Sequence, residues 1–248
     1  MIFFKKSRLF AVFLLIQSNI LLAQNNFQCQ QMFDKYIAGL GEYEAPKEGK
    51  HYFVHTVVST IPNTLSKEYS PSAYSSENIN VRVVIAKGKV FYYSNYLDFY
   101  QDNKDLFTII HPQKLIIWQK PESQREEDKQ AFQLTPFRKK MLDELALIEC
   151  IDVVIDKKKS KQIMFSPKKQ TYQRFISKVT YFFDEKVGKL EKQETIYAEG
   201  QANLRQEIIY KEFNANYTEK VADSAIENVF DSRKKLLNRF KGYTVEFK

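Results

Sequence analysis

The feature that most constrains the fold is the stretch 79–118, where short β-branched and aromatic runs follow one another closely. The first two runs are Ile79–Ala86 and Val90–Ser94, and Gly88 lies between them. A glycine between two such runs is a hairpin signal, because it supplies the positive φ that tight turns need. The stretch therefore begins as a β-hairpin.

Two more runs, Leu106–Ile110 and Leu115–Trp118, complete this stretch after a polar break. Pro112 lies between them and belongs in a turn, because proline cannot donate to a β-ladder. We therefore expect an antiparallel meander. A sheet with one wet face alternates apolar and polar residues, yet 83–85 and 91–93 are apolar at consecutive positions. Both faces need cover, either as the concave interior of a curved sheet or as a filled two-layer core, and periodicity cannot separate the two.

The first residues read as a targeting segment. Three basic residues precede the apolar run Leu9–Ile16, and a small-residue site ends at Ala23. This pattern predicts a secretory signal peptide over residues 1–23, with an uncleaved anchor as the alternative, although the run is short for a membrane span. We expect one exported domain over residues 24–248, soluble after cleavage.

The chain carries a formal charge of +8, and the basic residues are scattered among acids. The one dense cluster, 157–161, lies between two apolar runs, where a solvated hairpin tip is expected. A nucleic-acid site needs a continuous basic face, usually with stacking aromatics, so we expect no nucleic-acid partner. Transient contact with an anionic membrane surface remains open.

Two amphipathic helices are expected to cover the sheet. Phe27–Leu40 has an apolar stripe at three- and four-residue spacing, and Gly41 follows it. Thr135–Ile148 starts with a capping threonine and a proline at the first helical position. Because neither helix is long enough to be stable alone, each stripe must dock on the sheet.

Further strands are predicted before and after the central stretch, giving nine to eleven strands and two or three helices. In 192–197 and 205–210 the outward positions are charged, which predicts one wetter face. Residues 222–240 are mixed, and a short helix or a loop fits them. The additional predicted strands are Tyr52–Ile61, Ile151–Ile155, Gln162–Phe165, Phe175–Phe183, Leu190–Tyr197, Leu204–Phe213 and Tyr243–Phe247.

Residues that carry chemistry are few. His51 and His55 lie about 13 Å apart at the rise of a strand, which is too far for one metal ion. No nucleophile, zinc-protease or phosphate-loop motif occurs, so we expect no enzyme, metal or cofactor. Cys29 and Cys150 can form a disulfide if their Cα atoms lie within about 7 Å, and the sequence leaves this open. Glycosylation at Ser224, in an Asp-Ser-Ala triplet, also stays open.

The order of these elements resembles the periplasmic lipoprotein-carrier family, the LolA- and LolB-like proteins of Gram-negative bacteria. The resemblance rests on the helix around 32–36, the hairpin 81–94, the pair 106–118 and the later run 179–190. It implies a mainly β (α+β) fold, a curved antiparallel sheet or open β-barrel with helices as a lid over an apolar cavity. It also implies a periplasmic location. Arg82 lies on a strand, but its neighbours do not match the family's lid-holding arginine.

Two functions follow as expectations. The first is an exported carrier of an apolar ligand, a lipid or lipoprotein acyl chain, in a cavity between sheet and helices. The second is a non-enzymatic envelope interaction or scaffold domain with a filled core and a protein partner. The expected ligand-binding residues are Met32, Phe33, Tyr36, Ile37, Val83, Ile85, Phe91, Tyr93, Ile109, Ile117, Phe137, Met141 and Leu145.

Overall fold

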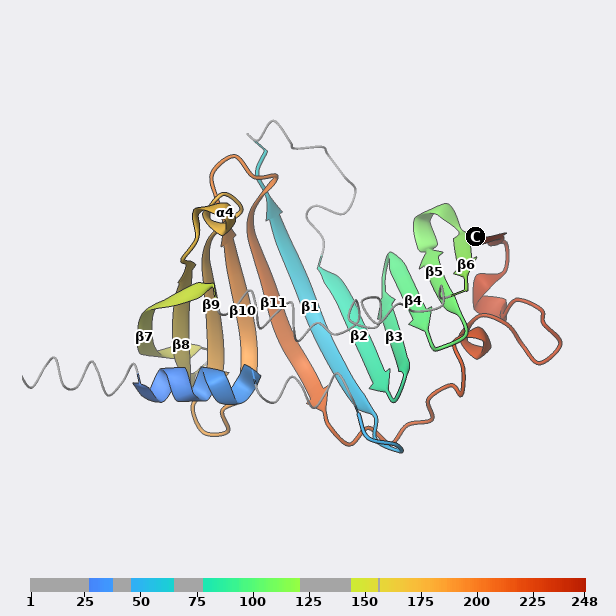
Figure 1. Ribbon diagram of the computed structural model, residues 1–248, viewed down its shortest axis with the longest axis horizontal. Helices are drawn as coiled ribbons and strands as arrows, with labels where there is room; N and C mark the ends of the chain where they lie inside the picture. The colour runs from blue at the N-terminus through green and yellow to red at the C-terminus, as the bar shows by residue number, and fades with distance from the viewer. Residues whose placement is uncertain (1–26, 38–45, 65–77, 121–143, 156) are drawn as a thin grey trace, which may run out of the picture.

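The computed structural model describes residues 27–37, 46–64, 78–120, 144–155 and 157–248, which form one sheet of twelve strands (Figure 1). The strand order is β12-β6-β5-β4-β3-β2-β1-β11-β10-β9-β8-β7, and the sheet is not closed. Every neighbouring pair is antiparallel except β12 and β6. The strands are β1 (Tyr52–Pro62), β2 (Ile79–Ala86), β3 (Lys89–Ser94), β4 (Leu97–Gln101), β5 (Leu106–Ile110), β6 (Leu115–Gln119), β7 (Leu145–Ile155), β8 (Lys158–Pro167), β9 (Ile176–Asp184), β10 (Leu190–Tyr197), β11 (Asn203–Asn214) and β12 (Thr244–Phe247).

Helical elements are short among the described residues. The N-terminal helix covers residues 27–37, in agreement with the amphipathic helix predicted there. The other helical elements are α4 (Gln170–Gln173) and the 3₁₀ turns η1 (His111–Gln113), η2 (Ile226–Asn228) and η3 (Asn238–Phe240). The described residues contain no helix that is both long and apolar enough to cross a membrane.

The predicted fold class, a curved and open antiparallel sheet with few helices, is confirmed. Gly88 and Gly188 sit in hairpin turns with φ of 68° and 64°, as the sequence indicated. All eleven predicted strands form. The structure has one further strand, β4, which the sequence did not predict. The signal peptide predicted over residues 1–23 lies outside the described residues.

The helix predicted over Thr135–Ile148 is wrong at its end. Residues up to 143 are outside the described part of the chain, and from Leu145 the chain is strand β7. A bulge between Leu147 and Glu149 shifts the register against β8. The bulge lets Leu145, Leu147 and Cys150 all contribute to one cluster, whereas Ile148, which continues the helical spacing from Leu145, is 53% exposed.

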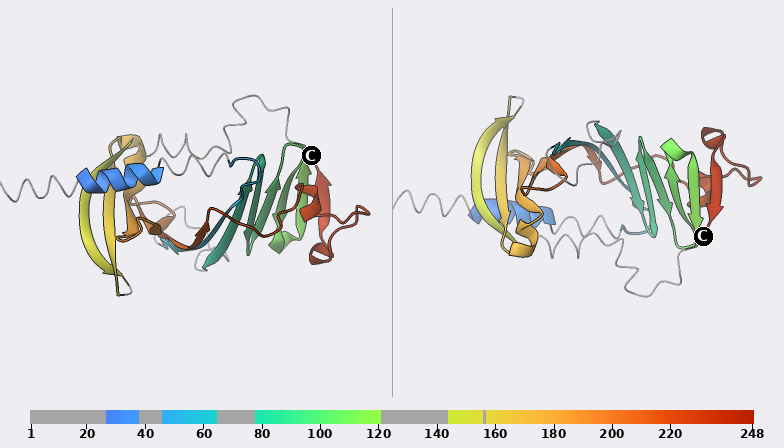
Figure 2. Two further views of the ribbon diagram at one scale, coloured as in Figure 1. Left: turned by 90° about the horizontal axis from the view of Figure 1, so that it is seen from below. Right: turned by 90° about the horizontal axis from the view of Figure 1, so that it is seen from above.

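The two faces of the sheet are covered at opposite ends. Along β1, Thr56 pairs with Tyr210, which packs into the cluster under the N-terminal helix, whereas Phe53 points to the other side. We call the face that carries Thr56 and Tyr210 the helix-side face, and the face that carries Phe53 the far face. Figure 2 shows the sheet bent into a trough, with the N-terminal helix over the β7–β10 end. The C-terminal segment, 215–248, covers the far face of β2–β6.

A row of directly opposed apolar residues runs under the C-terminal segment. It starts at Phe53 on β1 and crosses seven strands to Phe247 on β12, which belongs to the segment itself and is 64% exposed. Tyr100 and Phe107 in its centre are fully buried. The row consists of Phe53, Val84, Phe91, Tyr100, Phe107, Trp118 and Phe247.

Buried carboxylates tie the C-terminal segment to the sheet. Asp102 accepts a hydrogen bond from the Ala225 amide at 2.6 Å. Asp98 lies 3.2 Å from His111 Nε2, and His111 Nδ1 lies 3.0 Å from the Tyr243 hydroxyl. These ties fix the segment at two places, because a buried carboxylate without partners would be costly.

Candidate functional site

The candidate site is the helix-side face of β1–β6, which the N-terminal helix does not cover. Along each strand its residues alternate with those of the buried far-face row. Because both sets are largely apolar, the strands show apolar residues at consecutive positions. Two rows of directly opposed residues cross it, and their side chains are mostly half-buried. The first row is Val54, Val83, Tyr92, Phe99, Thr108 and Ile117, and the second is Tyr52, Ile85, Val90, Gln101 and Leu106.

One polar atom within this face stands out. Gln101 Oε1 is buried, and no hydrogen-bond partner for it is seen among the described residues. Buried acceptors are nearly always satisfied, so an unpaired one suits a donor supplied by a bound molecule. The face therefore combines an apolar floor with one acceptor.

The N-terminal helix is fixed beside this face. Cys29 forms a disulfide with Cys150 of β7, with Cα atoms 6.4 Å apart, which answers the question that the sequence left open. The Phe33 ring lies 4.4 Å from that of Phe165 and 5.0 Å from that of Tyr181, centroid to centroid. Phe33 is 3% exposed. The space between helix and strands is thus occupied by side chains at this end.

The predicted ligand-binding residues separate into three groups. Val83, Ile85 and Ile117 lie on the helix-side face of β1–β6. Five others belong to the cluster between the N-terminal helix and β7–β10, and three lie on the far face under the C-terminal segment. Phe137 and Met141 are outside the described residues. The five are Met32, Phe33, Tyr36, Ile37 and Leu145, and the three are Phe91, Tyr93 and Ile109.

The predicted set lacks Tyr52, Tyr92 and Phe99, the aromatic residues of the candidate site. The signal was present in the alternation of β3, because Val83 pairs with Tyr92 and Val84 with Phe91. To decide which of the two alternating sets of residues faces the site, one must know what covers each face of the sheet. The cover of the far face comes from 215–248, where the sequence showed no clear pattern.

Arg82 belongs to the far face and not to the site. It pairs with Tyr93 across the β2–β3 ladder, and its guanidinium lies 5.9 Å from the centroid of the Tyr93 ring. An arginine in that position does not reach the helix-side face.

The far face of β9–β11 is polar, as the charged outward positions predicted. Arg205 contacts Glu194 at 2.7 Å and Glu207 at 2.6 Å, and Lys192 contacts Glu207 at 2.9 Å. Burial raises the pKa of Glu207, but the hydrogen bond from Lys192 and the charges of Lys192 and Arg205 outweigh it and lower that pKa. This network separates the wet part of the far face from the covered part.

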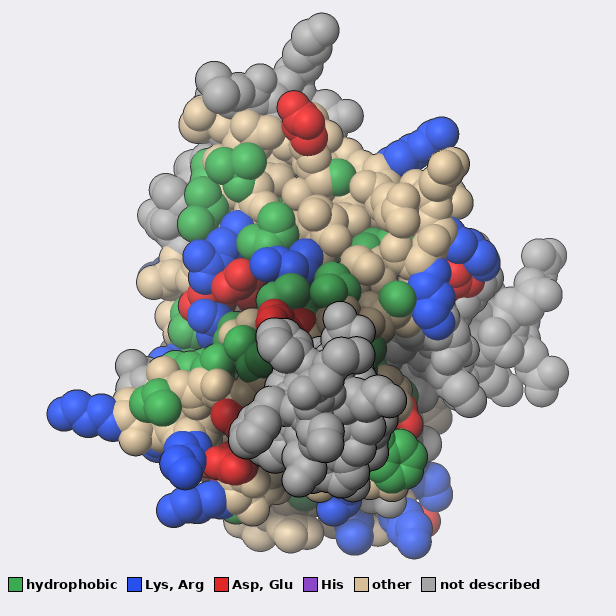
Figure 3. All heavy atoms as spheres, turned by 90° about the vertical axis from the view of Figure 1, so that its left-hand side faces the viewer, with side chains coloured by type: hydrophobic (Ala, Val, Ile, Leu, Met, Phe, Trp, Pro, Cys, Tyr) green, Lys and Arg blue, Asp and Glu red, His purple; other side chains and the backbone are tan. Residues whose placement is uncertain are grey.

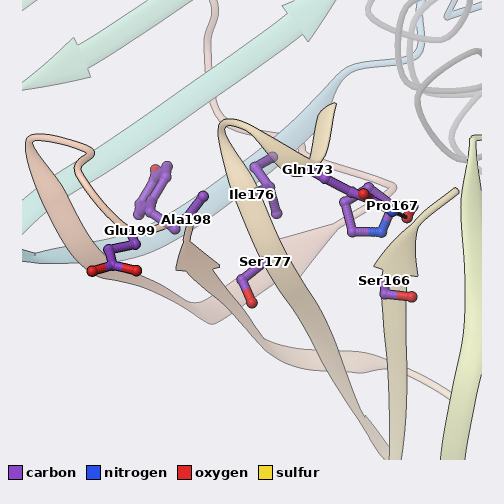
Figure 4. A pocket seen from close by; sticks show the side chains of 8 residues that line it. Ser166, Pro167, Gln173, Ile176, Ser177, Ala198 and Glu199 are labelled. Atoms are coloured by element: carbon purple, nitrogen blue, oxygen red, sulfur yellow. Dashed lines mark hydrogen bonds between the residues drawn. The ribbon is translucent and has the colours of Figure 1, made fainter. Parts of the chain in front are cut away.

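An open hollow of about 320 Å³ lies at the ends of β8–β10 near α4 (Figure 4). It is lined by Ser166, Pro167, Gln173, Ile176, Ser177, Tyr197, Ala198 and Glu199. None of the predicted site residues lines it. Its few polar groups come from surface side chains, so it does not define a chemistry.

The remaining features are the side chains that could bind a metal or take part in catalysis. Within the described ranges, no group of three His, Cys, Asp or Glu side chains could hold a metal ion. The one histidine in a buried polar cluster, His111, bridges Asp98 and Tyr243. The Tyr100 hydroxyl donates to the same carboxylate at 2.5 Å, and burial followed by the Asp98 charge raises the pKa of Tyr100. These contacts hold the C-terminal segment.

No family model and no curated protein matches the chain. Several solved structures are similar in overall fold. One is a conserved uncharacterized protein from Thermus thermophilus, 8% identical, with a TM-score of 0.41 over 89% of this chain and 99% of that chain.

Two other solved structures are similar to this chain. A LolA superfamily protein from Nitrosomonas europaea is 10% identical, with a TM-score of 0.28 over 77% of this chain and 94% of that chain. The complex of MucA and MucB from Pseudomonas aeruginosa is 10% identical, with a TM-score of 0.34 over 74% of this chain and 58% of that chain. The chain is thus similar to proteins that include LolA superfamily members, and the similarity is one of fold alone.

Proposed function

We propose that this protein is an exported binder or carrier of an apolar ligand, a lipid or lipoprotein acyl chain, held on the helix-side face of β1–β6. The observation that carries the proposal is the row from Val54 to Ile117, whose side chains are half-buried and, apart from Thr108, apolar or aromatic. The two buried apolar clusters among the described residues lie elsewhere, one under the N-terminal helix and one under the C-terminal segment.

The chemistry of this face favours a long apolar chain. Burying apolar surface yields about 25 cal/mol per Å², so a ligand that follows the row across several strands gains in proportion to its length. The aromatic rings of Tyr92 and Phe99 supply large contact areas. Gln101 Oε1 offers one acceptor to a hydroxyl or amide of the ligand's polar end.

The position of the N-terminal helix shapes the mechanism. A lid that opens by separating from β7–β10 would have to break the Cys29–Cys150 bond or carry β7 with it. Ligand exchange therefore takes place beside the helix, on the β1–β6 part of the face. The helix acts as a fixed wall at one end of the site.

A binding titration with a fluorescent fatty acid tests the proposal. We expect saturable binding to the exported protein, and Val83→Asn with Phe99→Asn should weaken it at least tenfold by placing polar groups on the floor. Ile196→Asn is the matched control, because Ile196 is half-buried on the far face of β10. Equal loss in the control, or no saturable binding in the wild type, contradicts the proposal.

The alternative function is an envelope interaction domain with a protein partner. It is favoured by the filled packing in both apolar clusters and by the disulfide that fixes the helix. If native mass spectrometry of the exported protein shows no bound lipid and the titration fails, this second function takes the place of the first.

A further inference from the structure

A second surface lies at one end of the sheet, where two hairpin turns adjoin. Strands β7 and β8 are joined by the turn at Lys157, and β9 and β10 by the turn 185–189. The Glu185 amide donates to the Lys159 carbonyl at 3.3 Å, and Ser160 pairs with Asp184. The two turns therefore form one tip, which we call the basic tip.

Lysines dominate the charge of the basic tip. All five of them are exposed, and within the described ranges none takes part in an ion pair. The acids that the structure describes there are Asp184 and Glu185, and by sequence Asp156 also belongs to the β7–β8 turn. Asp184 is already engaged, because its carboxylate accepts the Lys186 and Val187 amides at 2.8 and 3.0 Å. These hydrogen bonds, with the charges of Lys158 and Lys186, lower the pKa of Asp184. The five lysines are Lys157, Lys158, Lys159, Lys186 and Lys189.

The basic tip also carries two exposed apolar side chains. Val154 is 71% exposed and Val187 is 72% exposed. Val154 pairs with Lys159 across the β7–β8 ladder, and Val187 lies between Lys186 and Lys189 in the other turn. Figure 3, which faces the β7 end, shows hydrophobic side chains interspersed with lysines and arginines.

We propose that the basic tip docks on an anionic lipid surface. Lysines place their ammonium groups among lipid headgroups while their stems lie along apolar surface, and the two valines enter the headgroup boundary. A site for single-stranded nucleic acid would offer aromatic stacking platforms. In the basic tip the nearest aromatic residue, Phe183, is fully buried.

The attraction is electrostatic and short in range. Each lysine near an anionic surface contributes roughly a fivefold gain in affinity, and the gain fades beyond the Debye length. That length shortens from roughly 10 Å to roughly 3 Å when salt rises from about 0.1 M to about 1 M. Binding should therefore fall steeply with salt. The proposal does not depend on the apolar site, because docking needs no bound ligand.

Cosedimentation with vesicles tests the proposal. The mature protein should bind mixed phosphatidylcholine–phosphatidylglycerol vesicles and bind phosphatidylcholine vesicles at least tenfold more weakly. Replacing Lys158, Lys159, Lys186 and Lys189 together by Gln should remove this preference. The control replaces the exposed lysines Lys220, Lys235, Lys241 and Lys248 by Gln, with the same change in net charge.

The control separates a specific tip from general attraction. We expect the control to bind within twofold of the wild type, and both variants to keep the wild-type circular dichroism spectrum and melting temperature. A further variant, Val154→Asn with Val187→Asn, should weaken vesicle binding at unchanged charge. Equal losses in the two lysine variants, equal binding to both vesicle types, or tighter binding to a single-stranded oligonucleotide than to vesicles overturns the proposal.

Discussion

At the scale of single residues, the polar contacts of the C-terminal segment are the clearest test of how it is held. The Tyr243 hydroxyl lies 3.0 Å from His111 Nδ1, and His111 Nε2 lies 3.2 Å from Asp98. Tyr243→Phe removes this hydrogen bond and should lower the free energy of unfolding by about 1 kcal/mol in urea titration. Tyr197→Phe is the control, since no hydrogen bond of its hydroxyl is seen among the described residues. A loss of the same size in both variants would show that the contact is not specific.

The pKa of Glu207 leads to a prediction about acid stability. Because this pKa is lowered below 4.5, the carboxylate stabilises the folded state above that pH, and the stabilisation is lost as pH falls through the folded pKa. The free energy of unfolding should fall between about pH 5 and pH 3, and less steeply in Glu207→Gln. Urea titrations across this range measure the slopes. Glu212→Gln, at an exposed position, should keep the wild-type slope, and an unchanged slope in Glu207→Gln would refute the assignment.

At the scale of elements, the N-terminal helix depends on the Cys29–Cys150 bond. This disulfide joins residues separated by 121 positions, so it restricts a long loop in the unfolded chain. Its loss should lower the free energy of unfolding by about 2–4 kcal/mol. We expect dithiothreitol to lower the melting temperature of the wild type and to leave that of a Cys29→Ser, Cys150→Ser variant unchanged. Two free thiols in the denatured, unreduced protein would contradict the pairing.

The elements also show what the sequence could and could not predict. The hairpin at Gly88 and the 27–37 helix follow from local signals, namely turn chemistry and helical spacing. Strand β4 was missed because Leu97–Gln101 is short and adjoins a polar break. The start of β7 has helical spacing in the sequence, because Leu145 and Ile148 are three residues apart. In the structure a bulge between Leu147 and Glu149 accounts for this spacing within a strand. Local signals do not reveal a bulge, since it depends on the partner strand.

At the scale of the whole molecule, the candidate site is the part of the sheet that neither the described N-terminal helix nor the C-terminal segment covers. The sequence predicted that both faces need cover, and it grouped six strand residues as one wall without deciding which of them point to the same side. In the structure Val83, Ile85 and Ile117 lie on one face. The sequence could not tell that Phe91, Tyr93 and Ile109 lie on the other face. That distinction depends on 215–248, which packs through long-range contacts such as the Ala225 amide to Asp102.

The proposed function places an apolar chain along the helix-side face of β1–β6. Photo-crosslinking with a diazirine fatty acid, followed by peptide mapping, tests it most directly. We predict saturable labelling of β2, β3, β4 and β6 at Val83, Tyr92, Phe99 and Ile117, which unlabelled fatty acid competes away. Labelling confined to residues of the far face, or labelling that competitor does not reduce, would contradict the account.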